Sequence, residues 1–510
     1  MISKCFTIGL TGLHGFIVEV EADINPGLFQ INIVGLANKA IQEAKERIIC
    51  ALKSANFSLP YQRITINLAP AERVKTGPSY DLPIALAILC ASKQCPALPR
   101  DSIFVGELAL SAALRPVKGV LAISESAKNL GFKHIYLPEI NAQEAGIVAG
   151  ITAWPIKNLV QIVKAASGNI KLVPGKKYTF KKYFNHLFAE NYPDLAEIAG
   201  QENAKRALEI AAAGGHNLLL SGSPGVGKTY LARALNRILP PLLFSESLEV
   251  TKIHSIAGLL PQEGLASQRP FRCPHHSCSF NSLIGGGANP RPGEISLAHH
   301  GVLFLDEFNE IPRYILEALR QPLEDRAVVI ARSRETVTFP CNFTLVAAMN
   351  PCKCGFYGER ERRCSCSAFD LLHYRKRISG ALLDRIDLQV HVDRLGRKEI
   401  FNKKNWGQVS SQNVQNKVIA ARELQYQRLK KILNKKPASN SALDNKFLKI
   451  VCLLDPGAES LLEKAYEKLH LSTRGYFRCL KVARTIADLE KSETITTDHI
   501  TEAVSFRIAV

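Results

Sequence analysis

The sequence predicts a protein of mixed α/β class, built around a parallel, doubly wound sheet. The chain has 510 residues, which corresponds to about three domains at about 150 residues each. In its middle part, short apolar runs alternate with helical stretches, as they do in doubly wound folds. After about residue 393 the apolar residues follow mainly a helical period. We therefore expect an α+β domain, a sheet domain and a helical domain, in that order.

The N-terminal part, residues 1–170, is expected to be an α+β domain. Residues 29–36 and 63–68 alternate apolar and polar side chains, which is typical of strands, whereas residues 40–52 place their apolar side chains on one helical face. Residues 171–194 mix Gly, Pro, Lys and aromatic residues without a clear period. This composition predicts a linker between domains.

The central part, residues 195–395, contains three short apolar runs that predict parallel strands covered on both faces, namely residues 217–221, 301–305 and 344–349. Residues 328–339 are expected to form two strands around a basic turn. The last part, residues 396–510, is expected to be helical, with helical periodicity in residues 417–433 and 460–489.

A glycine-rich segment after the first of these strands matches the P-loop pattern. Its backbone N–H groups would face phosphate oxygens at the start of a helix, the lysine would contact the β- and γ-phosphates, and the threonine hydroxyl would bind Mg²⁺. The sequence therefore predicts binding of ATP and Mg²⁺ by Gly222, Ser223, Pro224, Gly225, Val226, Gly227, Lys228 and Thr229.

Polar residues at the ends of the other two strands complete this prediction. Asp306 and Glu307 follow the run 301–305, and Asn350 follows the run 344–349. In open α/β sheets, ligands bind at the carboxyl ends of the strands. We expect Asp306 to hold Mg²⁺ opposite Thr229 and Glu307 to polarise the attacking water, with Asn350 near the same water. The alternative is that the two acids only cap the next helix.

The charge distribution favours a polyanionic partner. The chain carries 65 Lys and Arg against 46 Asp and Glu, and residues 397–510 alone carry 21 against 12. Nucleic acid is the commonest partner for such a surplus, although a solvated, lysine-rich surface is an alternative. The longest nearly apolar run, residues 82–91, is half the length of a membrane span, and the first ten residues do not resemble a signal peptide. We expect a soluble, cytoplasmic protein without a membrane partner.

Four of the thirteen cysteines form two C-x-C pairs, Cys352 with Cys354 and Cys364 with Cys366. Four thiolates around one ion describe a structural zinc site, whereas four free thiols in a loop are the alternative. The loop between the pairs carries three arginines beside Phe356 and Tyr357. This loop either contacts DNA or forms an exposed charged knuckle, and the arginines in question are Arg360, Arg362 and Arg363.

Several motifs together resemble an AAA+ ATPase of the magnesium-chelatase-like branch, and the similarity to the ComM/YifB family extends over nearly the whole chain. Besides the P-loop, the motifs are FRCPHHSCS, LIGGGANPRPGEISLAHHGVLFLDE, AAMNP, NPCKCG, LLDRID and STRGYFRCLKVARTIADL. The resemblance implies that Asn350 is sensor 1 and that Arg385 is an arginine finger for the neighbouring subunit. It also implies that Arg474 is sensor 2, with Arg478 as a competing candidate one helical turn later.

The resemblance further implies a homo-hexameric DNA motor. Its expected activity is ATP-dependent branch migration on single-stranded and branched DNA during natural transformation or homologous recombination, alongside recombination proteins. The turn at Arg332 and Arg334 would then point into the pore of the ring. The alternative is a chelatase-type ATPase that remodels a protein partner. A second metal site at Cys273, His275, His276 and Cys278 is compatible with their ligand types but is disfavoured by the resemblance.

Residues 76–82 and 114–121 resemble the fold of the Lon protease catalytic domain. Ser79 falls at the position of the Lon nucleophile, but a serine needs a base to accept its proton. The position at which Lon has its lysine is occupied by Ile123, and Lys118 and Lys128 are out of register. We therefore expect a non-proteolytic N-terminal domain in which Ser79 is a turn residue.

Overall fold

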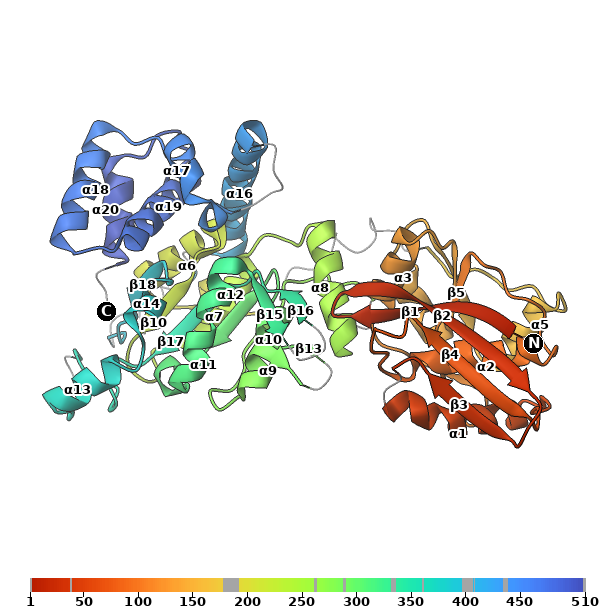
Figure 1. Cartoon of the computed structure of the whole chain (residues 1–510). Helices are drawn as coiled ribbons and strands as arrows, with labels where there is room; N and C mark the ends of the chain where they lie inside the picture. The colour runs from red at the N-terminus through yellow and green to blue at the C-terminus, as the bar shows by residue number, and fades with distance from the viewer. Residues whose placement is uncertain are drawn as a thin grey trace.

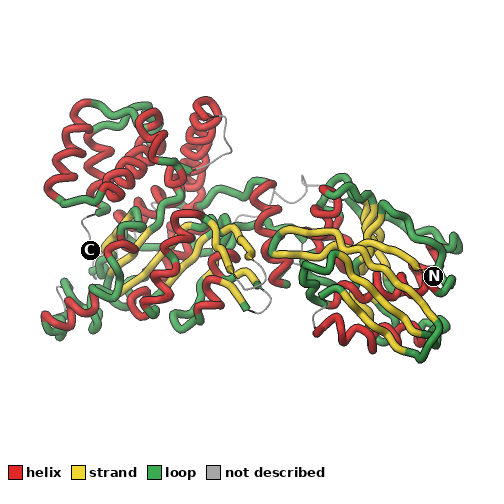
Figure 2. The backbone as a smooth tube through the Cα atoms, viewed as in Figure 1, coloured by secondary structure: helices red, strands yellow, loops and turns green. Residues whose placement is uncertain are grey.

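The computed structural model describes residues 2–36, 39–177, 192–260, 264–287, 290–331, 336–359, 362–396, 407, 409–433 and 439–507. The chain forms an N-terminal α/β part, a central part around a parallel sheet and a helical C-terminal part (Figure 1). The strands gather in the first two parts, whereas the C-terminal part is built from helices (Figure 2). The predicted fold class is thus confirmed in its mixed α/β character, its parallel sheet and its helical C-terminus.

The first sheet of the N-terminal part has the order β1-β2-β4-β3 and combines antiparallel pairs with one parallel pair, β3–β4. Both predicted strands and the predicted helix between them are present. The elements are β1 (Ile2–Thr11), β2 (His14–Asn25), β3 (Gln30–Val34), α1 (Lys39–Ser54) and β4 (Arg63–Ala69).

A buried helix, α2 (Asp81–Ala91), packs against β1 and β2 and leads to a small parallel sheet of order β5-β8-β9. The short strands of this sheet were not predicted. The remaining elements of this part are η1 (Pro78–Tyr80), β5 (Ser102–Phe104), β6 (Glu107–Leu108), β7 (Leu114–Arg115), α3 (Val120–Asn129), β8 (His134–Pro138), η2 (Glu139–Asn141), α4 (Ala142–Ala145), β9 (Thr152–Ile156) and α5 (Leu159–Ala166).

Both described ends of the predicted linker 171–194 are attached to the neighbouring parts. Gly175 donates its N–H to the carbonyl of Ala153 at 2.8 Å, which ties the first end to the N-terminal part. At the other end, Asp194 accepts the N–H of Ser411 and pairs with Arg237. Most of the segment between these two ends, residues 178–191, lies outside the described residues.

The central sheet has five parallel strands in the order β11-β14-β17-β10-β18. Two separate apolar clusters cover its two faces, one contributed by α6, α7 and the C-terminal helices and the other by the helices around β14. The strands are β10 (Leu218–Ser221), β11 (Phe271–Arg272), β14 (Val302–Leu305), β17 (Thr344–Met349) and β18 (Leu388–His391). The three strands predicted here are confirmed, and all three are buried.

Helices and two antiparallel strand pairs surround this sheet. One pair is the predicted hairpin, β15 (Ala327–Ala331) with β16 (Thr336–Pro340), and the other is β12 (Gly285–Gly286) with β13 (Arg291–Pro292). The helical elements are η4 (Leu195–Glu197), α6 (Glu202–Gly214), α7 (Lys228–Ile238), α8 (Phe244–Ala257), α9 (Phe280–Ile284), α10 (Glu294–Leu297), η5 (Phe308–Glu310), α11 (Arg313–Ala318), α12 (Arg320–Asp325), α13 (Ala368–Arg375) and α14 (Gly380–Leu383).

The C-terminal part consists of α16 (Ser411–Leu433), η7 (Asn440–Ala442), α17 (Asn445–Val451), α18 (Pro456–Lys468), α19 (Thr473–Leu489) and α20 (Thr497–Ser505). The periodic stretch 460–489 forms two helices. Ser472 is the N-cap of α19, because its side chain accepts the N–H of Gly475. Helix α16 packs on α6, α7 and α19, which joins this part to the central sheet.

Helix α8 connects the N-terminal part to the central part (Figure 1). It packs against α3, and its side chains pair with N-terminal carboxylates: Lys252 with Glu125, and Ser255 with Glu144. One turn away from Lys252, Glu249 ties the helix to the central part through its contacts with His299 and His300.

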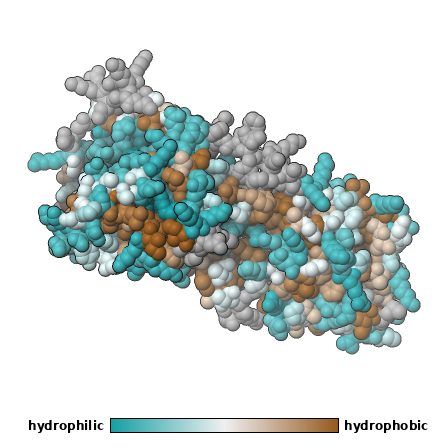
Figure 3. Space-filling view, turned by 90° about the horizontal axis from the view of Figure 1, so that it is seen from above, coloured by the Kyte–Doolittle hydropathy of each residue, from teal (hydrophilic) through white to brown (hydrophobic). Residues whose placement is uncertain are grey.

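On the face seen in Figure 3, hydrophilic side chains surround several apolar patches. None of the described helices combines the length and the apolar character that a membrane span requires.

Candidate nucleotide and metal sites

The P-loop connects β10 to α7 at the carboxyl edge of the central sheet. Strand β10 ends at Ser221 and α7 begins at Lys228, so the six residues between them turn the chain tightly. Gly225 and Gly227 have φ angles of 80° and 93°, a left-handed region that favours glycine. The sequence thus folds locally as the motif requires, with backbone N–H groups gathered at a helix start.

Lys228 is buried within this loop, at 8% exposure. Its Nζ donates to the carbonyls of Gly222 and Ser223 and, at 3.1 Å, to Oδ1 of Asn350. Burial lowers the pKa of Lys228, while the charge of Asp306 opposes that shift. Binding of a nucleotide phosphate therefore requires the ammonium group to exchange at least one of these oxygens for a phosphate oxygen.

The two acids at the end of β14 lie beside the P-loop. The Thr229 hydroxyl donates to Oδ2 of Asp306 at 3.0 Å, and Oδ1 of Asp306 accepts the N–H of Glu307 at 2.9 Å. A cleft of about 500 Å³ is lined by both acids, Asn350 and P-loop residues. Tyr230 and Arg233 of α7 also line it and were not predicted. The structure therefore brings the predicted nucleotide-site residues together, while their individual roles stay predictions.

His276 contacts the predicted water-polarising residue. Its Nδ1 lies 2.7 Å from Oε2 of Glu307, whereas Nδ1 of His275 contacts the hydroxyl of Ser277. Among the described residues, the four ligand atoms of Cys273, His275, His276 and Cys278 are not grouped as a metal site would require. The motif FRCPHHSCS contributes to the family resemblance, but it did not predict the contact of His276 with Glu307.

Arg385 and Arg474 meet at a shared acid instead of at the P-loop of the same chain. Nη2 of Arg385 lies 2.8 Å from Oε1 of Glu324, and Nη2 of Arg474 lies 2.6 Å from the same oxygen. The Arg385 side chain is 5% exposed, whereas that of Arg474 is 46% exposed. A role for Arg385 toward a neighbouring subunit thus requires its ion pair with Glu324 to open.

Arg478, the competing sensor 2 candidate, has an internal role. It pairs with Asp387 and donates to the carbonyl of Arg385 at 2.9 Å. Asp387 also accepts the backbone N–H of Asn217 and lies 3.7 Å from the ring of His216. Arg478 therefore fixes the start of β18 against α19, while the sensor 2 role of Arg474 stays a prediction.

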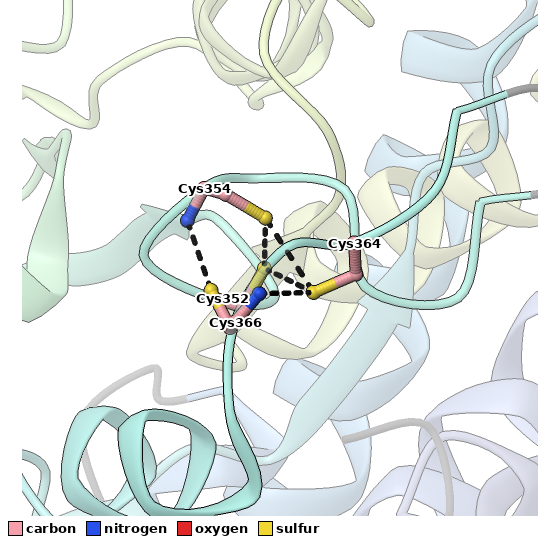
Figure 4. A group of neighbouring side chains, drawn as sticks. All are labelled: Cys352, Cys354, Cys364 and Cys366. Atoms are coloured by element: carbon pink, nitrogen blue, oxygen red, sulfur yellow. Dashed lines mark hydrogen bonds between the residues drawn. The ribbon is translucent and has the colours of Figure 1, made fainter.

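The four cysteines of the two C-x-C pairs converge in space (Figure 4). Sγ of Cys354 lies 3.3 Å from Sγ of Cys352 and 3.5 Å from Sγ of Cys364, and the distance between Cys352 and Cys364 is 3.7 Å. The fourth, Cys366, accepts the N–H of Cys354. Four thiolates at about 2.3 Å from a tetrahedral zinc ion would lie about 3.8 Å apart.

The donor set fits a structural zinc site in its chemistry and in its spacing. All four ligand atoms lie within 4.8 Å of one another. The backbone N–H of Phe356 lowers the pKa of Cys354 to about 5, which favours its thiolate, whereas the neighbouring thiols raise the pKa of Cys364 and Cys366. Gly355 lies against the P-loop, since a Cβ at this residue would lie 2.7 Å from Cδ of Pro224. The cysteine loop is therefore a neighbour of the nucleotide site.

The predicted DNA contacts are only partly described. Arg362 and Arg363 are exposed, and the Arg362 guanidinium lies over the Phe356 ring at 4.0 Å. This stacking occupies one face of a ring that was predicted to stack on bases. The remaining candidates, Arg332, Arg334 and Arg360, lie outside the described residues.

Glu249, His299 and His300 form a second group of side chains that could bind a metal ion. Their contacts with one another account for this grouping without a metal. The Nε2 atoms of both histidines lie within 3.0 Å of Oε2 of Glu249. Nδ1 of His299 accepts the N–H of Asn342 at 2.9 Å, so a neutral His299 carries its proton on Nε2 and donates it to Glu249. That nitrogen has no lone pair left for a metal ion.

In the N-terminal part, Ser79 lies in the short turn η1 that precedes α2, and its carbonyl accepts the N–H of Gly106. Ile123 is buried in an apolar cluster, so it supplies no base. The similarity of this part to the Lon fold stays a prediction.

Three family models of the magnesium chelatase subunit ChlI match this chain. They are described as "Subunit ChlI of Mg-chelatase" for residues 20–141, "Magnesium chelatase, subunit ChlI" for residues 194–400 and "Magnesium chelatase, subunit ChlI C-terminal" for residues 408–507. The P-loop and both strand-end acids fall within the second match, and Arg474 falls within the third.

Individual relatives match the chain over different lengths. The competence protein ComM of Haemophilus influenzae is 41% identical over 98% of this chain and 96% of its own length. The uncharacterized protein YifB of Escherichia coli is 41% identical over 99% of this chain and 97% of its own length. The magnesium-chelatase 38 kDa subunit of Rhodobacter capsulatus is 25% identical over 62% of this chain. The chain therefore belongs to the ComM/YifB family of magnesium-chelatase-like AAA+ proteins.

Proposed function

We propose that this protein is an ATP-driven motor that acts on single-stranded and branched DNA as a homo-hexamer. Its proposed role is branch migration while incoming strands are integrated in natural transformation or homologous recombination. The observation that carries the proposal is the assembled cleft of Lys228, Thr229, Asp306, Glu307 and Asn350 in a chain that matches a competence protein over nearly its full length.

Each residue of the cleft has a defined task in ATP hydrolysis. Lys228 neutralises the β- and γ-phosphates, while Thr229 and Asp306 hold Mg²⁺, which when bound offsets the negative charge of the phosphates. Glu307 accepts a proton from the attacking water at its carboxylate, and Asn350 orients that water. His276 donates to the same carboxylate and thereby positions it.

The position of two arginines outside the cleft supports a ring. Arg385 and Arg474 share Glu324 and do not line the cleft of their own chain. A guanidinium that reaches the phosphates from a neighbouring subunit would complete the charge stabilisation of the transition state. Hydrolysis in such an arrangement depends on assembly.

The basic surplus of the chain supports DNA as the polyanion. The formal net charge is +19, and exposed Arg362 and Arg363 lie on the cysteine loop beside the P-loop. We propose that structural zinc holds this loop and that Arg332, Arg334 and Arg360 add further phosphate contacts. Phosphate contacts of this kind make binding sensitive to salt.

The direct test is an ATPase titration with single-stranded, duplex and forked DNA, combined with particle imaging of the oligomeric state. We expect stimulation by single-stranded or forked DNA, rings in the presence of nucleotide, and movement of a synthetic four-way junction that Lys228→Ala cannot move. An ATPase that ignores DNA, in a protein that moves no junction, would contradict the proposal. Stimulation by a protein partner alone would instead favour the chelatase-type alternative, since magnesium chelatase subunits match residues 194–400.

A further inference from the structure

A small polar cavity of about 100 Å³ lies at the amino edge of the central sheet, opposite the P-loop. The residues that precede its strands line the cavity on one side, among them Asn217 before β10 and Asp387 before β18. The end of α12 and the helices α16 and α19 supply the remaining walls, through Arg326, Arg422 and Arg478. The cavity therefore lies where the central and C-terminal parts meet.

Four arginines but only two carboxylates line this cavity, and both carboxylates are already paired. Glu246 lies 2.8 Å from Nη2 of Arg269 and also accepts the N–H of Leu243. Asp387 pairs with Arg478 and accepts the N–H of Asn217. Neither acid is in contact with Arg326 or Arg422, although Asp387 acts on Arg326 and Glu246 on Arg422 through space.

Arg326 and Arg422 have no carboxylate partner among the described residues. Nε and Nη2 of Arg422 donate to the carbonyl of Ala212 at 3.2 and 2.9 Å. Nη2 of Arg326 reaches only the Ser441 hydroxyl, at 3.5 Å. The backbone of Arg326 is fixed at the end of α12, since its N–H donates to the carbonyl of Pro322 and its carbonyl accepts the N–H of Cys341.

Burial and mutual repulsion disfavour the charges around this cavity. Burial lowers the pKa of Arg422 to about 9. The charges of Arg269 and Arg326 act in the same direction, whereas the charge of Glu246 opposes the shift. Burial and the charge of Arg478 lower the pKa of Lys481 to about 8, and Lys481 reaches the carbonyl of Ser441. An unpaired buried charge costs free energy, and a bound anion would offset this cost.

We propose that this cavity binds a tetrahedral oxyanion of the phosphate class, held by the guanidinium groups of Arg326 and Arg422. A planar guanidinium matches phosphate oxygens in a bidentate manner. The cavity, at about 100 Å³, has room for a small anion of this kind. The anion would join the end of α12 to α16 and thereby tie the helical part to the sheet.

Two sources can supply this chemistry, namely free phosphate or a phosphate group of DNA. The proposal does not rest on ATP hydrolysis, since none of the four arginines lines the P-loop cleft. The test uses the full chain saturated with Mg²⁺ and ADP, so that the P-loop is filled. Inorganic phosphate is titrated by calorimetry in chloride buffer of constant ionic strength, and a short single-stranded oligonucleotide is titrated in parallel.

We expect one phosphate per chain and at least a tenfold weaker affinity in Arg326→Gln and in Arg422→Gln. Arg320→Gln is the matched control, because Arg320 belongs to the same helix α12 but is exposed and paired with Glu317. Its phosphate affinity should equal that of the unmodified protein. If only the oligonucleotide binds, and Arg326→Gln weakens it tenfold while Arg320→Gln does not, the source is DNA.

Thermal unfolding provides a second test. It distinguishes a variant that is poorly folded from one that has lost only its binding site. Phosphate should raise the Tm of the unmodified protein above its value in chloride, because a ligand of the folded state stabilises it. In chloride alone, Arg326→Gln should be at least as stable as the unmodified protein, since it removes one of two unpaired charges. Equal effects of phosphate and chloride, or equal binding by the Arg326 and Arg320 variants, would overturn the proposal.

Discussion

The two edges of the central sheet both gather cations, but they do so in different ways. At the carboxyl edge, Lys228 already contacts three oxygens, and Asp306 lies beside it at the end of a strand. At the amino edge, Arg326 and Arg422 face a cavity without a carboxylate partner among the described residues. The first site is built within eight consecutive residues and two neighbouring strand ends, whereas the second combines residues about 100 positions apart. A local motif can therefore predict one candidate phosphate site, whereas the dispersed residues of the proposed second site carry no sequence signal.

The largest effect is expected from Lys228→Ala at the carboxyl edge. Loss of the buried ammonium group removes its bonds to phosphate, and we expect nucleotide affinity to fall about a hundredfold and ATP turnover to become undetectable. The measurement is a titration with a fluorescent ADP analogue. Arg326→Gln is the comparison variant and should keep its nucleotide affinity within about twofold. Similar losses in both variants would mean that the two edges do not act independently.

Arg385→Ala separates nucleotide binding from turnover. Because Arg385 is remote from the cleft of its own chain, nucleotide affinity should remain within about twofold, while turnover falls about a thousandfold. Steady-state ATPase assays and particle imaging measure the two properties. Full turnover by an isolated monomer would contradict a shared site, and so would an unchanged rate in the variant.

Replacement of Cys352 and Cys354 by Ser tests the metal beside the carboxyl edge. Bound zinc should fall from one per chain to none, and Tm should decrease because two of the four ligands are lost. Nucleotide affinity should also weaken severalfold, since the loop lies against Pro224. Elemental analysis measures the metal, and a double replacement of Cys90 and Cys95 by Ser is the control for cysteine loss elsewhere. An unchanged zinc content would contradict the assignment.

His276→Ala tests the contact to Glu307. If His276 positions that carboxylate, its replacement should lower kcat by less than about tenfold and leave KM for ATP constant. Glu307→Gln should lower kcat by about 10² to 10⁴. His275→Ala is the matched control, because its ring contacts Ser277 instead. Equal rates for His275→Ala and His276→Ala would rule out this positioning role.

The smallest effect concerns acid stability at the amino edge. His216 is fully buried, and burial lowers its pKa although Asp387 opposes the shift. The unfolded chain takes up a proton near pH 6.5 that the folded chain does not, so this residue stabilises the fold above that pH, and its contribution decreases as pH falls below it. Urea unfolding at pH 7.5 and 5.5 should therefore show a smaller loss for His216→Asn than for the unmodified protein. An equal loss would contradict this account.

Much of the fold could be predicted because the deciding signals were local. The apolar runs before Ser221, Asp306 and Asn350 are fully buried strands, and the P-loop glycines have the backbone angles that the motif requires. The two-residue strands β11, β12 and β13 were not predicted, since so short an element carries no period. The same holds for the break between α18 and α19, which depends on one capping residue, Ser472.

Only those residues of the candidate site that belong to a sequence motif could be predicted. The four cysteines converge as their paired spacing indicated. The contacts of Glu324 with Arg385 and of His276 with Glu307 were missed because they join residues from separate elements, and no spacing in the chain encodes them. The cavity at the amino edge was missed for the same reason.

Helix α8 contacts the N-terminal part through Lys252 and Ser255 and the central part through Glu249. A helix that contacts two parts of the chain couples their positions. If the proposed motor rotates the sheet during ATP hydrolysis, these contacts would carry the movement to the N-terminal part, and a spectroscopic probe attached there would report it.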